Sequence, residues 1–512
     1  MNRILDIDYH KVLEQFTYNP SQPMLFNSGV FLWLFLVFTF FYMLLGRRDT
    51  LRLLFVTLFS YYFYYKSSGI YFFLLAVVTM SDYLIAKAID NVQKNHDEKG
   101  HFHNAKSKWL LALSLMIDLG LLGYFKYTNF FGSIYVDITG GSFEMLDIFL
   151  PVGISFFTFQ SLSYIIDVYR GTLQPLNSIL DYAFYVSFFP QLVAGPIVRA
   201  HDFIPQIRKP IEITKEMFGT GVFFIVGGLF KKAVISDYIS INFVERVFDQ
   251  PSLYSGFENL MGVYGYALQI YCDFSGYSDM AIGIALLLGF KFPINFNAPY
   301  KSSSITEFWR RWHISLSSWL KDYLYISMGG NRKGKFRQYI NLLITMLLGG
   351  LWHGASLNFV VWGGLHGILL ALDKIWKQVC PKLSPVPSKH DTLKPNKIVS
   401  FIGGIATFHI VCLAWVFFRC GSFDTAFSMI LQIINHFQPQ VIYQWITGYW
   451  AVAAFILIGY LLHFMPQGLS AFTKQMVIKM PLVLQVLLIV IVIYIVIQIK
   501  SSDVLPFIYF QF

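Results

Sequence analysis

Charged residues are scarce in this chain of 512 residues. Asp, Glu, Lys and Arg together make up 13% of it, whereas a soluble domain usually carries about 25%. Hydrophobic residues make up 55%, and they fall in long blocks close to the roughly 20 residues that a helix needs to cross a bilayer. One water-soluble core cannot hold so many apolar residues. The composition therefore excludes an ordinary globular protein and predicts an all-α, polytopic membrane protein.

Cysteine is also scarce, and no CxxC pair occurs among the four residues. We expect all four to be small core residues and not disulfide partners or metal ligands. They are Cys272, Cys380, Cys412 and Cys420. The histidines discussed below do not have the spacing of a zinc site either, so the sequence predicts no bound metal.

The net charge of +10 does not indicate nucleic-acid binding. Lys and Arg cluster in short loops between apolar blocks, which is the pattern of cytoplasmic loops in membrane proteins. These loops lie near residues 47–52, 87–108, 301–337 and 374–397. If they face the cytoplasm, both ends of the chain lie outside.

The apolar blocks predict about eleven to thirteen membrane segments, some of them re-entrant. The candidates are 24–46, 51–66, 69–88, 109–126, 151–169, 178–198, 217–236, 259–290, 338–352, 355–375, 399–418, 446–465 and 481–500. We expect an extracytoplasmic N-terminal segment over 1–23, without a cleavable signal. A transmembrane domain over 24–500 and an extracytoplasmic aromatic tail over 501–512 would follow it.

Ionisable residues inside apolar blocks are costly and are therefore functional candidates. His353 and His366 lie in LLGGLWHGASLNFVVWGGLHG, with His353 between Gly350 and Gly354. Glycine permits a helix break, and irregular backbone at membrane depth is tolerated where it lines a cavity. An imidazole there could act as a base near neutral pH. A core histidine bonded to a neighbouring helix is an equally good interpretation.

The stretch around His313, EFWRRWHISLSSWLKDYLYISMGGNRKG, is too polar to span a membrane and unusually aromatic. We expect a re-entrant or interfacial segment that faces the cytoplasm. Its side chains could bind the phosphates of a coenzyme A or phosphopantetheine donor. The candidates are Arg310, Arg311, Trp312 and Lys321. Simple anchoring at the membrane interface is the alternative for each of them.

Two aspartates, Asp273 and Asp279, interrupt the apolar block YCDFSGYSDMAIGIALLLGF. Asp279 could orient a histidine. Considered singly, each aspartate is expected to cap a helix.

The two long histidine-containing motifs, in this order, resemble the membrane-bound O-acyltransferase superfamily. Within it, the chain is similar to the bacterial branch that contains the alginate and peptidoglycan O-acetylation membrane proteins. PVGISFFTFQSLSYIIDVYRG, FFPQLVAGPIVR and WVFFR extend the resemblance over about residues 24–512. The resemblance implies that His353 is the main catalytic histidine and His313 the second, in a helical bundle around a funnel open to the cytoplasm.

The same resemblance implies a function and partners. An acetyl group would pass from acetyl-CoA, or an acyl carrier, through a bacterial inner membrane to an extracytoplasmic polysaccharide, with no further cofactor. A separate SGNH-type acyltransferase would make the final transfer, because no such module is visible in this chain.

The chain ends Pro506-Phe-Ile-Tyr-Phe-Gln-Phe512, which resembles the end of the small partner peptide in the D-alanylation system of teichoic acids. That resemblance implies that Tyr509 is an acyl relay, loaded with help from His353. An aromatic tail anchored at the membrane interface is the alternative.

Other functions remain open from the sequence. D-alanyl or other acyl transfer to a cell-envelope polymer uses the same chemistry. A transporter of lipid-linked sugars would share the spans and basic loops, although it predicts an internal repeat that is not visible. A structural scaffold predicts that polymer acetylation survives the loss of His353.

Overall fold

The computed structural model describes residues 14–20, 23–46, 48–97, 104–383, 396–499 and 507–508. These residues are mainly helical and contain no strand, which confirms the all-α class. Tyr509 lies outside the described residues, as does most of the predicted tail. The predicted bounds 1–23, 24–500 and 501–512 refer to sides of a membrane and stay a prediction.

The chain forms two compact units. The first comprises Met1–Thr214 and Ile284–Phe292, and the second comprises Lys215–Gly283 and Pro293–Phe512. His313, His353 and every candidate donor-binding residue belong to the second unit.

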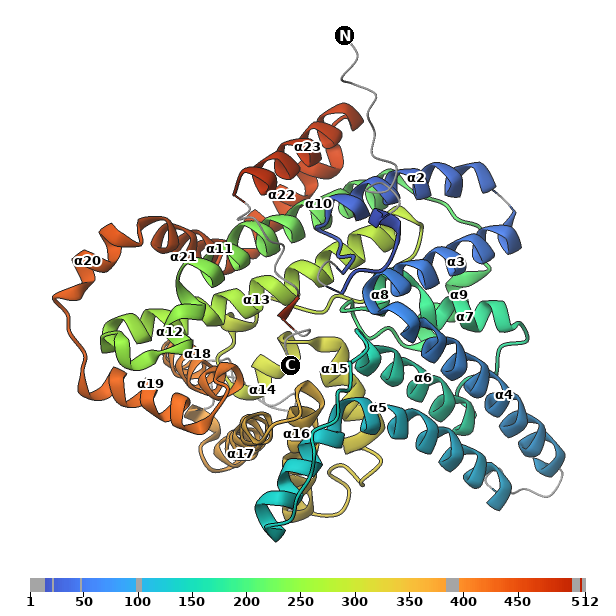
Figure 1. Ribbon diagram of the computed structural model, residues 1–512, viewed down its shortest axis with the longest axis horizontal. Coiled ribbons are helices and arrows are strands. Elements are labelled where there is room, and N and C mark those ends of the chain that lie inside the picture. Colours follow the sequence, from blue (N-terminus) through green and yellow to red (C-terminus); the bar gives the residue numbers. More distant parts are fainter. Residues whose placement is uncertain are drawn as a thin grey trace. The chain divides into compact units, whose positions relative to one another are not determined.

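Within the described residues, the helices of the first unit include α2 (Gly29–Leu45), α3 (Asp49–Ser68), α4 (Phe72–Asp97), α5 (Ala105–Thr139), α6 (Ile154–Tyr169), α7 (Ile179–Ser187), α8 (Phe189–Leu192) and α9 (Ala200–Ile207). Helices α4, α5 and α6 pack against one another, and α3 packs against α7 (Figure 1). Phe189 is buried among the rings of Phe26, Phe38 and Phe63. These rings contribute packing, and we assign them no chemistry.

The second unit begins with a nearly continuous helical stretch and ends with pairs of shorter helices. Its elements are α10 (Lys215–Leu229), η2 (Phe230–Ser236), α11 (Asp237–Ile239), η3 (Ser240–Val244), α12 (Glu245–Asp249), α13 (Gly256–Leu287), α14 (Ile305–Arg311), α15 (Ile314–Trp319), η6 (Leu320–Tyr325), α16 (Lys335–His353), α17 (Leu357–Val379), α18 (Lys397–Arg419), α19 (Phe423–Asn435), α20 (Val441–Gly448), α21 (Trp450–His463), α22 (Gln467–Lys479) and α23 (Leu482–Ile499). The last turn of α13 belongs to the first unit.

Within the described residues, five helices are long and apolar enough to cross a membrane, or up to seven if each of two bent pairs is one span. The five are Asp49–Lys94, Ala105–Thr139, Lys215–Asp249, Leu357–Val379 and Lys397–Arg419. The first of them joins α3 to α4, and the third runs from α10 to α12. The bent pairs are Val441–Gly448 with Trp450–His463, at 90°, and Gln467–Lys479 with Leu482–Gln498, at 117°. Several other predicted segments correspond to helices too short to cross, such as α7. The block 259–290 lies almost wholly in the single helix α13.

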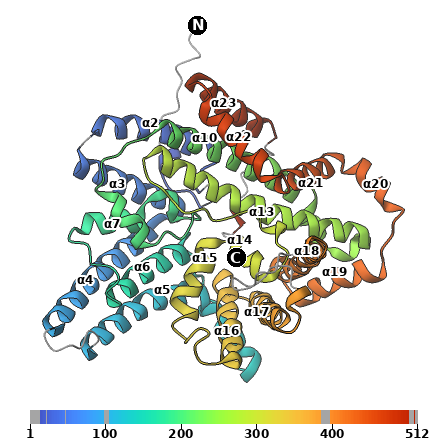
Figure 2. The same cartoon turned by 180° about the vertical axis from the view of Figure 1, so that it is seen from behind.

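Helices α16 and α17 form a hairpin and lie side by side in both views (Figure 1 and Figure 2). Glycines allow this close approach. A Cβ added at Gly350 would lie 2.2 Å from the carbonyl oxygen of Phe359, and one at Gly363 would lie 2.2 Å from that of Met346. Small residues at helix contacts let backbones approach in this way.

The expectation that Asp273 and Asp279 cap a helix is wrong. Both lie inside α13, and each pairs with a lysine of η2. Lys231 Nζ is 2.5 Å from Asp279 Oδ2, and Lys232 pairs with Asp273. Buried charges are tolerated when they are paired, so these aspartates join two helices of the second unit.

Candidate functional site

His353 is the last residue of α16, and the helix breaks directly after it. Gly354 follows in an extended conformation, and α17 begins at Leu357. A Cβ at residue 354 would collide with the ring of Phe359 at 2.0 Å, so the break requires glycine. The predicted interruption of the helix at His353 is therefore present.

Aromatic rings surround His353, whose side chain is buried. The ring centroids of Trp352, Trp362 and Phe418 lie 5.0, 5.1 and 5.4 Å from that of His353. Trp352 also lies 6.0 Å from His313. One tryptophan therefore contacts both predicted catalytic histidines, which come from different parts of the second unit.

His313 is fully buried and has a backbone conformation that is rare for a residue other than glycine. Its φ is 43° and its ψ is 56°, in the left-handed region. Such a conformation costs about 1–3 kcal/mol and persists where the surroundings impose it, often at functional sites. Here the constraint comes from the loop before α14. The Ile314 N–H donates to the Asn295 carbonyl at 2.9 Å, and the Asn297 N–H donates to the Arg311 carbonyl at 3.0 Å.

The side chain of Asn295 orients the His313 imidazole. Asn295 Oδ1 lies 3.2 Å from His313 Nδ1 and also accepts from the backbone N–H and hydroxyl of Ser315. The Asn295 amide nitrogen donates to Ser278 Oγ at 3.1 Å, which fixes Oδ1 as the acceptor toward the ring. The proton of a neutral His313 ring then lies on Nδ1. Nε2 carries the lone pair, and it has no hydrogen-bond partner among the described residues.

His366 has the opposite tautomer. The indole N–H of Trp309 donates to His366 Nδ1 at 3.2 Å. Because an indole N–H can only donate, Nδ1 carries a lone pair and the ring proton lies on Nε2. His366 therefore presents a donor where His313 presents an acceptor. Its ring centroid lies 4.9 Å from that of Trp362, next to His353.

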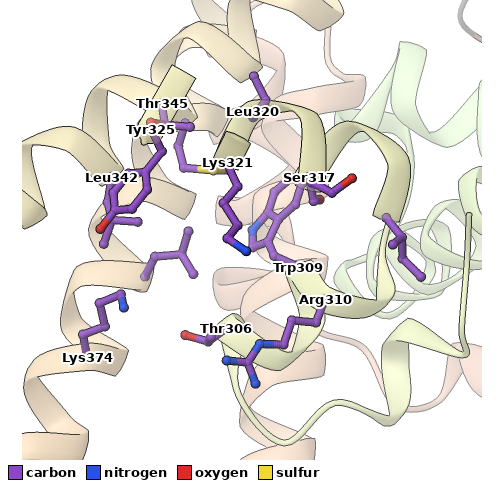
Figure 3. Close-up of a pocket in the computed structure, with 14 residues that line it drawn as sticks. Thr306, Trp309, Arg310, Ser317, Leu320, Lys321, Tyr325, Leu342, Thr345 and Lys374 are labelled. Atoms are coloured by element: carbon purple, nitrogen blue, oxygen red, sulfur yellow. The ribbon is translucent and has the colours of Figure 1, made fainter. Parts of the chain in front are cut away.

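We call His313, His353 and His366 the histidine cluster. A cavity of about 460 Å³ lies beside it (Figure 3). Arg310, Lys321 and Lys374 extend toward it from α14, η6 and α17, and the ring of Trp309 forms part of its wall (Figure 3). Most of the remaining lining is apolar. Three cations in the lining of a largely apolar cavity fit a ligand that carries phosphates on a long, mostly uncharged arm.

Neither His313 nor His353 lines this cavity. The ring of Trp309, in the cavity wall, lies 5.7 Å from that of Trp362, which in turn contacts His353. Two ring contacts thus lead from the cavity wall to His353.

Of the four predicted donor-binding residues, Arg310 and Lys321 line the cavity, and Arg311 and Trp312 do not. Arg311 is held by Glu307, 2.8 Å away, one helical turn earlier in α14. Burial raises the pKa of the Glu307 carboxyl, but hydrogen bonds from Ser303 and Arg311 outweigh this effect and hold the pKa below its ordinary value. Trp312 is buried against Phe308 and Trp415.

Sequence reasoning missed Trp309, Lys374 and Asn295. Trp309 and Lys374 lie in segments noted as aromatic or basic, but nothing local marks them as neighbours in space. Thr306, which also lines the cavity, donates its hydroxyl proton to Asp373, the residue before Lys374. That contact joins α14 to α17. It could be found only from the folded structure.

The cysteines are free. Cys272, Cys412 and Cys420 are buried as expected of core residues, whereas Cys380 is only partly buried. No group of three or more metal-ligating side chains converges in the part of the chain that the structure describes.

Known proteins share this sequence over most of its length. The model of MBOAT, the membrane-bound O-acyltransferase family, matches residues 173–417. The chain is 41% identical over 412 residues to the probable alginate O-acetylase AlgI of Pseudomonas aeruginosa, which covers 79% of this chain and 74% of that protein. It is 38% identical over 442 residues to the peptidoglycan O-acetyltransferase of Helicobacter pylori, which covers 80% of each.

A more distant relative is the teichoic acid D-alanyltransferase of Bacillus subtilis. It is 30% identical over 284 residues, which cover 52% of this chain and 68% of that protein. The relatives with the wider coverage, the apolar helices and the two histidine motifs all indicate the same family. This chain belongs to the membrane-bound O-acyltransferase family and is a multi-pass membrane O-acyltransferase.

Proposed function

We propose that this enzyme transfers an acetyl group from acetyl-CoA, on the cytoplasmic side of a bacterial inner membrane, toward an extracytoplasmic polysaccharide. The observation that carries the proposal is the cationic cavity beside a buried pair of histidines. The similarity to proteins named as alginate and peptidoglycan O-acetylating enzymes supports acetyl as the acyl group and a cell-envelope polymer as the acceptor.

The donor binds with its phosphates near Arg310, Lys321 and Lys374. Its uncharged pantetheine arm follows the apolar part of the cavity, and its thioester passes Trp309 and Trp362 to reach His353. Lys321 and Arg310 act by charge-assisted hydrogen bonds, which are the strong ones for phosphate.

His353 acts as the general base. It takes the proton of the acceptor hydroxyl while that oxygen attacks the thioester carbonyl; the C–S bond then breaks, and the proton passes to the leaving thiolate to give free coenzyme A. The imidazolium that forms lies at the carbonyl end of α16, where the partial negative charge of the helix terminus stabilises a cation. His313 Nε2 supplies a second acceptor within the same aromatic cluster. General-base catalysis and positioning are the two contributions that the protein makes.

Tyr509 is the first acceptor in this proposal. Its phenol oxygen gains the acetyl group, and an external SGNH-type acyltransferase then moves that group to the polysaccharide. The basis is the resemblance of the chain's end to an acyl-relay peptide. Replacing Tyr509 with Phe keeps the aromatic anchor and removes the nucleophile, so polymer acetylation should stop. Full acetylation by Tyr509→Phe, measured on the isolated polymer, would show that Tyr509 is not an acyl relay.

The acyl group and the polymer are identified by one experiment. Extracellular polysaccharide and peptidoglycan are isolated from cells with and without the chain, and their ester-linked acyl groups are measured by mass spectrometry. We expect acetyl esters to be lost from one polymer when the chain is absent. Loss of D-alanyl esters instead would show that the chain transfers D-alanyl groups, the activity named for the Bacillus subtilis relative, and not acetyl groups. No change in any polymer would contradict the proposed function.

Neutralising the cavity cations should weaken donor binding. Arg310→Gln and Lys321→Gln each remove one charged contact, and such a contact corresponds to about a tenfold or larger change in affinity. We expect the KM for acetyl-CoA to rise by about that factor in each variant, with little change in kcat. Steady-state release of coenzyme A measures both. Arg337→Gln removes an exposed charge on α16 outside the cavity and is the control. A KM unchanged in both test variants would show that acetyl-CoA does not bind in this cavity.

Removing the Asn295 side chain should release the orientation of His313. Asn295→Ala leaves His313 Nδ1 and the Ser315 hydroxyl without their shared acceptor. We expect about a tenfold lower rate of coenzyme A release, together with a stability loss of about 1–3 kcal/mol. Ser278→Ala removes the partner at the other end of the Asn295 amide and leaves the imidazole contact in place. Equal rates for the two variants would show that the His313 tautomer does not matter.

A further inference from the structure

The two described residues of the C-terminal tail are buried inside the second unit. Phe507 is 0% exposed and Ile508 is 3% exposed. The Phe507 ring lies 5.4 Å from Phe274 and 5.1 Å from Tyr277, both on α13. The backbone N–H of Ile508 donates to Asp273 Oδ2 at 3.1 Å. This environment is protein interior, whereas a tail that only anchors at a membrane interface would face lipid.

Asp273 divides its two carboxylate oxygens between two partners. Oδ1 accepts from Lys232, and Oδ2 accepts from the tail. Lys232 is itself held by Asp237, 2.8 Å away. The side chains of Lys232 and Asp273 are 3% and 4% exposed. Lys232 thus pairs with two carboxylates, those of Asp237 and Asp273. The second oxygen of Asp273 is left to accept a hydrogen bond from another segment of the chain.

A buried carboxylate is costly unless hydrogen bonds satisfy its oxygens. A backbone N–H delivered by another segment meets that requirement for Asp273 Oδ2. The contact does not depend on which side chain the donor residue carries. Selectivity for this tail comes instead from the ring contacts that Phe507 makes with Phe274 and Tyr277.

The docked tail lies close to the candidate catalytic cluster. Phe274 follows Asp273 in the chain, and its ring centroid lies 4.6 Å from that of His313 in an edge-to-face arrangement. One phenylalanine therefore contacts both the tail and His313. Tyr509 directly follows Ile508 in the sequence.

We propose that Asp273, held in place by Lys232 and Asp237, is a positioning residue that docks the chain's own C-terminal tail beside His313. The catalytic purpose of this docking rests on the proposed acyl relay. The docking itself does not, and the two are tested separately.

Docking is tested by the accessibility of the tail to carboxypeptidase A, followed by the intact mass of the purified protein. Asp273→Ala removes the acceptor of the Ile508 N–H but leaves Lys232 paired with Asp237, so the fold should survive. Asp279→Ala breaks the neighbouring ion pair on the same helix without contacting Phe507 or Ile508. It is the harsher change, because it leaves Lys231 without its acid partner, and it is therefore a stringent control.

We expect trimming of the wild type and of Asp279→Ala to stop before Ile508 is removed. In Asp273→Ala, trimming should continue through Ile508 and stop at Phe507, because carboxypeptidase A does not cleave after the penultimate Pro506. Protection of Ile508 in Asp273→Ala, or its loss to the same extent in Asp279→Ala, would overturn the docking role.

A second pair of variants changes only the tail. Ile508→Pro removes the N–H that Asp273 accepts, whereas Ile508→Ala keeps it and removes most of the side chain. The lost hydrogen bond to a charged acceptor corresponds to about a tenfold effect. Acyl transfer to polymer should therefore fall at least about tenfold in Ile508→Pro and remain within about threefold of wild type in Ile508→Ala. Equal activities in the two variants would contradict the docking role in catalysis.

The relay and the docking can fail independently. If Ile508 is removed only in Asp273→Ala and Tyr509→Phe still acetylates polymer, the docking stands and the relay is wrong. If Asp273→Ala is protected like the wild type, the docking is wrong, and the proposed function is untouched.

Discussion

Replacing His353 with Asn should lower acyl transfer by about 10²- to 10⁴-fold, the range that a general base contributes. Asparagine keeps a polar side chain at the end of α16 but cannot take a proton. The ring contacts of Trp352, Trp362 and Phe418 would lose one partner, so a modest fall in melting temperature is expected as well. The measurement is polymer acetylation in cells that lack the natural chain and express each variant to an equal level.

His409→Asn is the matched control for that experiment. His409 is an exposed histidine on α18 that bonds to the Tyr264 hydroxyl at 2.9 Å and lies outside the histidine cluster. It should leave acetylation within about twofold of wild type. Equal acetylation by His353→Asn and His409→Asn, at equal abundance, would eliminate His353 as the base and restore the scaffold interpretation.

Replacing Gly363 with Ala should unfold or misassemble the hairpin that carries His353. The added Cβ would lie 2.2 Å from the Met346 carbonyl oxygen and 3.1 Å from the Cα of Gly350. Backbone atoms cannot rotate away as a side chain can, so α16 and α17 must separate. Overpacking typically costs about 1–3 kcal/mol and sometimes more, and we expect the upper end of that range or beyond it. Melting temperature and the yield of monodisperse protein in detergent measure the effect.

The adjacent glycine is the control for this substitution. A Cβ at Gly364 would meet only the Cδ2 atom of Leu347, at 3.3 Å, and that flexible side chain can move. Gly364→Ala should therefore keep the melting temperature close to that of wild type, helped by the better helix propensity of alanine. If the two variants melt alike, the close approach of α16 and α17 is not a source of stability.

The features that could be predicted from the sequence are those with a local signal. The helix break at His353 follows from glycines within a few residues of it, and the structure has it there. The all-α membrane class follows from the composition and from the length of the apolar blocks. In the block 259–290, apolarity alone cannot distinguish a single long helix from a broken pair, and the structure has the single helix α13 there.

The features that could not be predicted depend on which helices become neighbours. A capping role for Asp273 and Asp279 is a sound local expectation, but their lysine partners come from η2, and no local rule pairs the two segments. Arg310 and Arg311 look equivalent in the sequence. The helical phase of α14 sends Arg310 to the cavity and leaves Arg311 paired with Glu307. Lys374 joins the cavity only because α17 packs against α14.

Purified protein incubated with acetyl-CoA labelled in the acetyl group is the most direct test of the central proposal, which is histidine-dependent acyl transfer from a thioester. We expect wild-type protein to release free coenzyme A and to move label from the thioester into an oxygen ester, and we expect His353→Asn to do neither. Equal release by a folded His353→Asn variant would contradict the proposal. So would folded wild-type protein that leaves acetyl-CoA intact while its polymer is acetylated in cells.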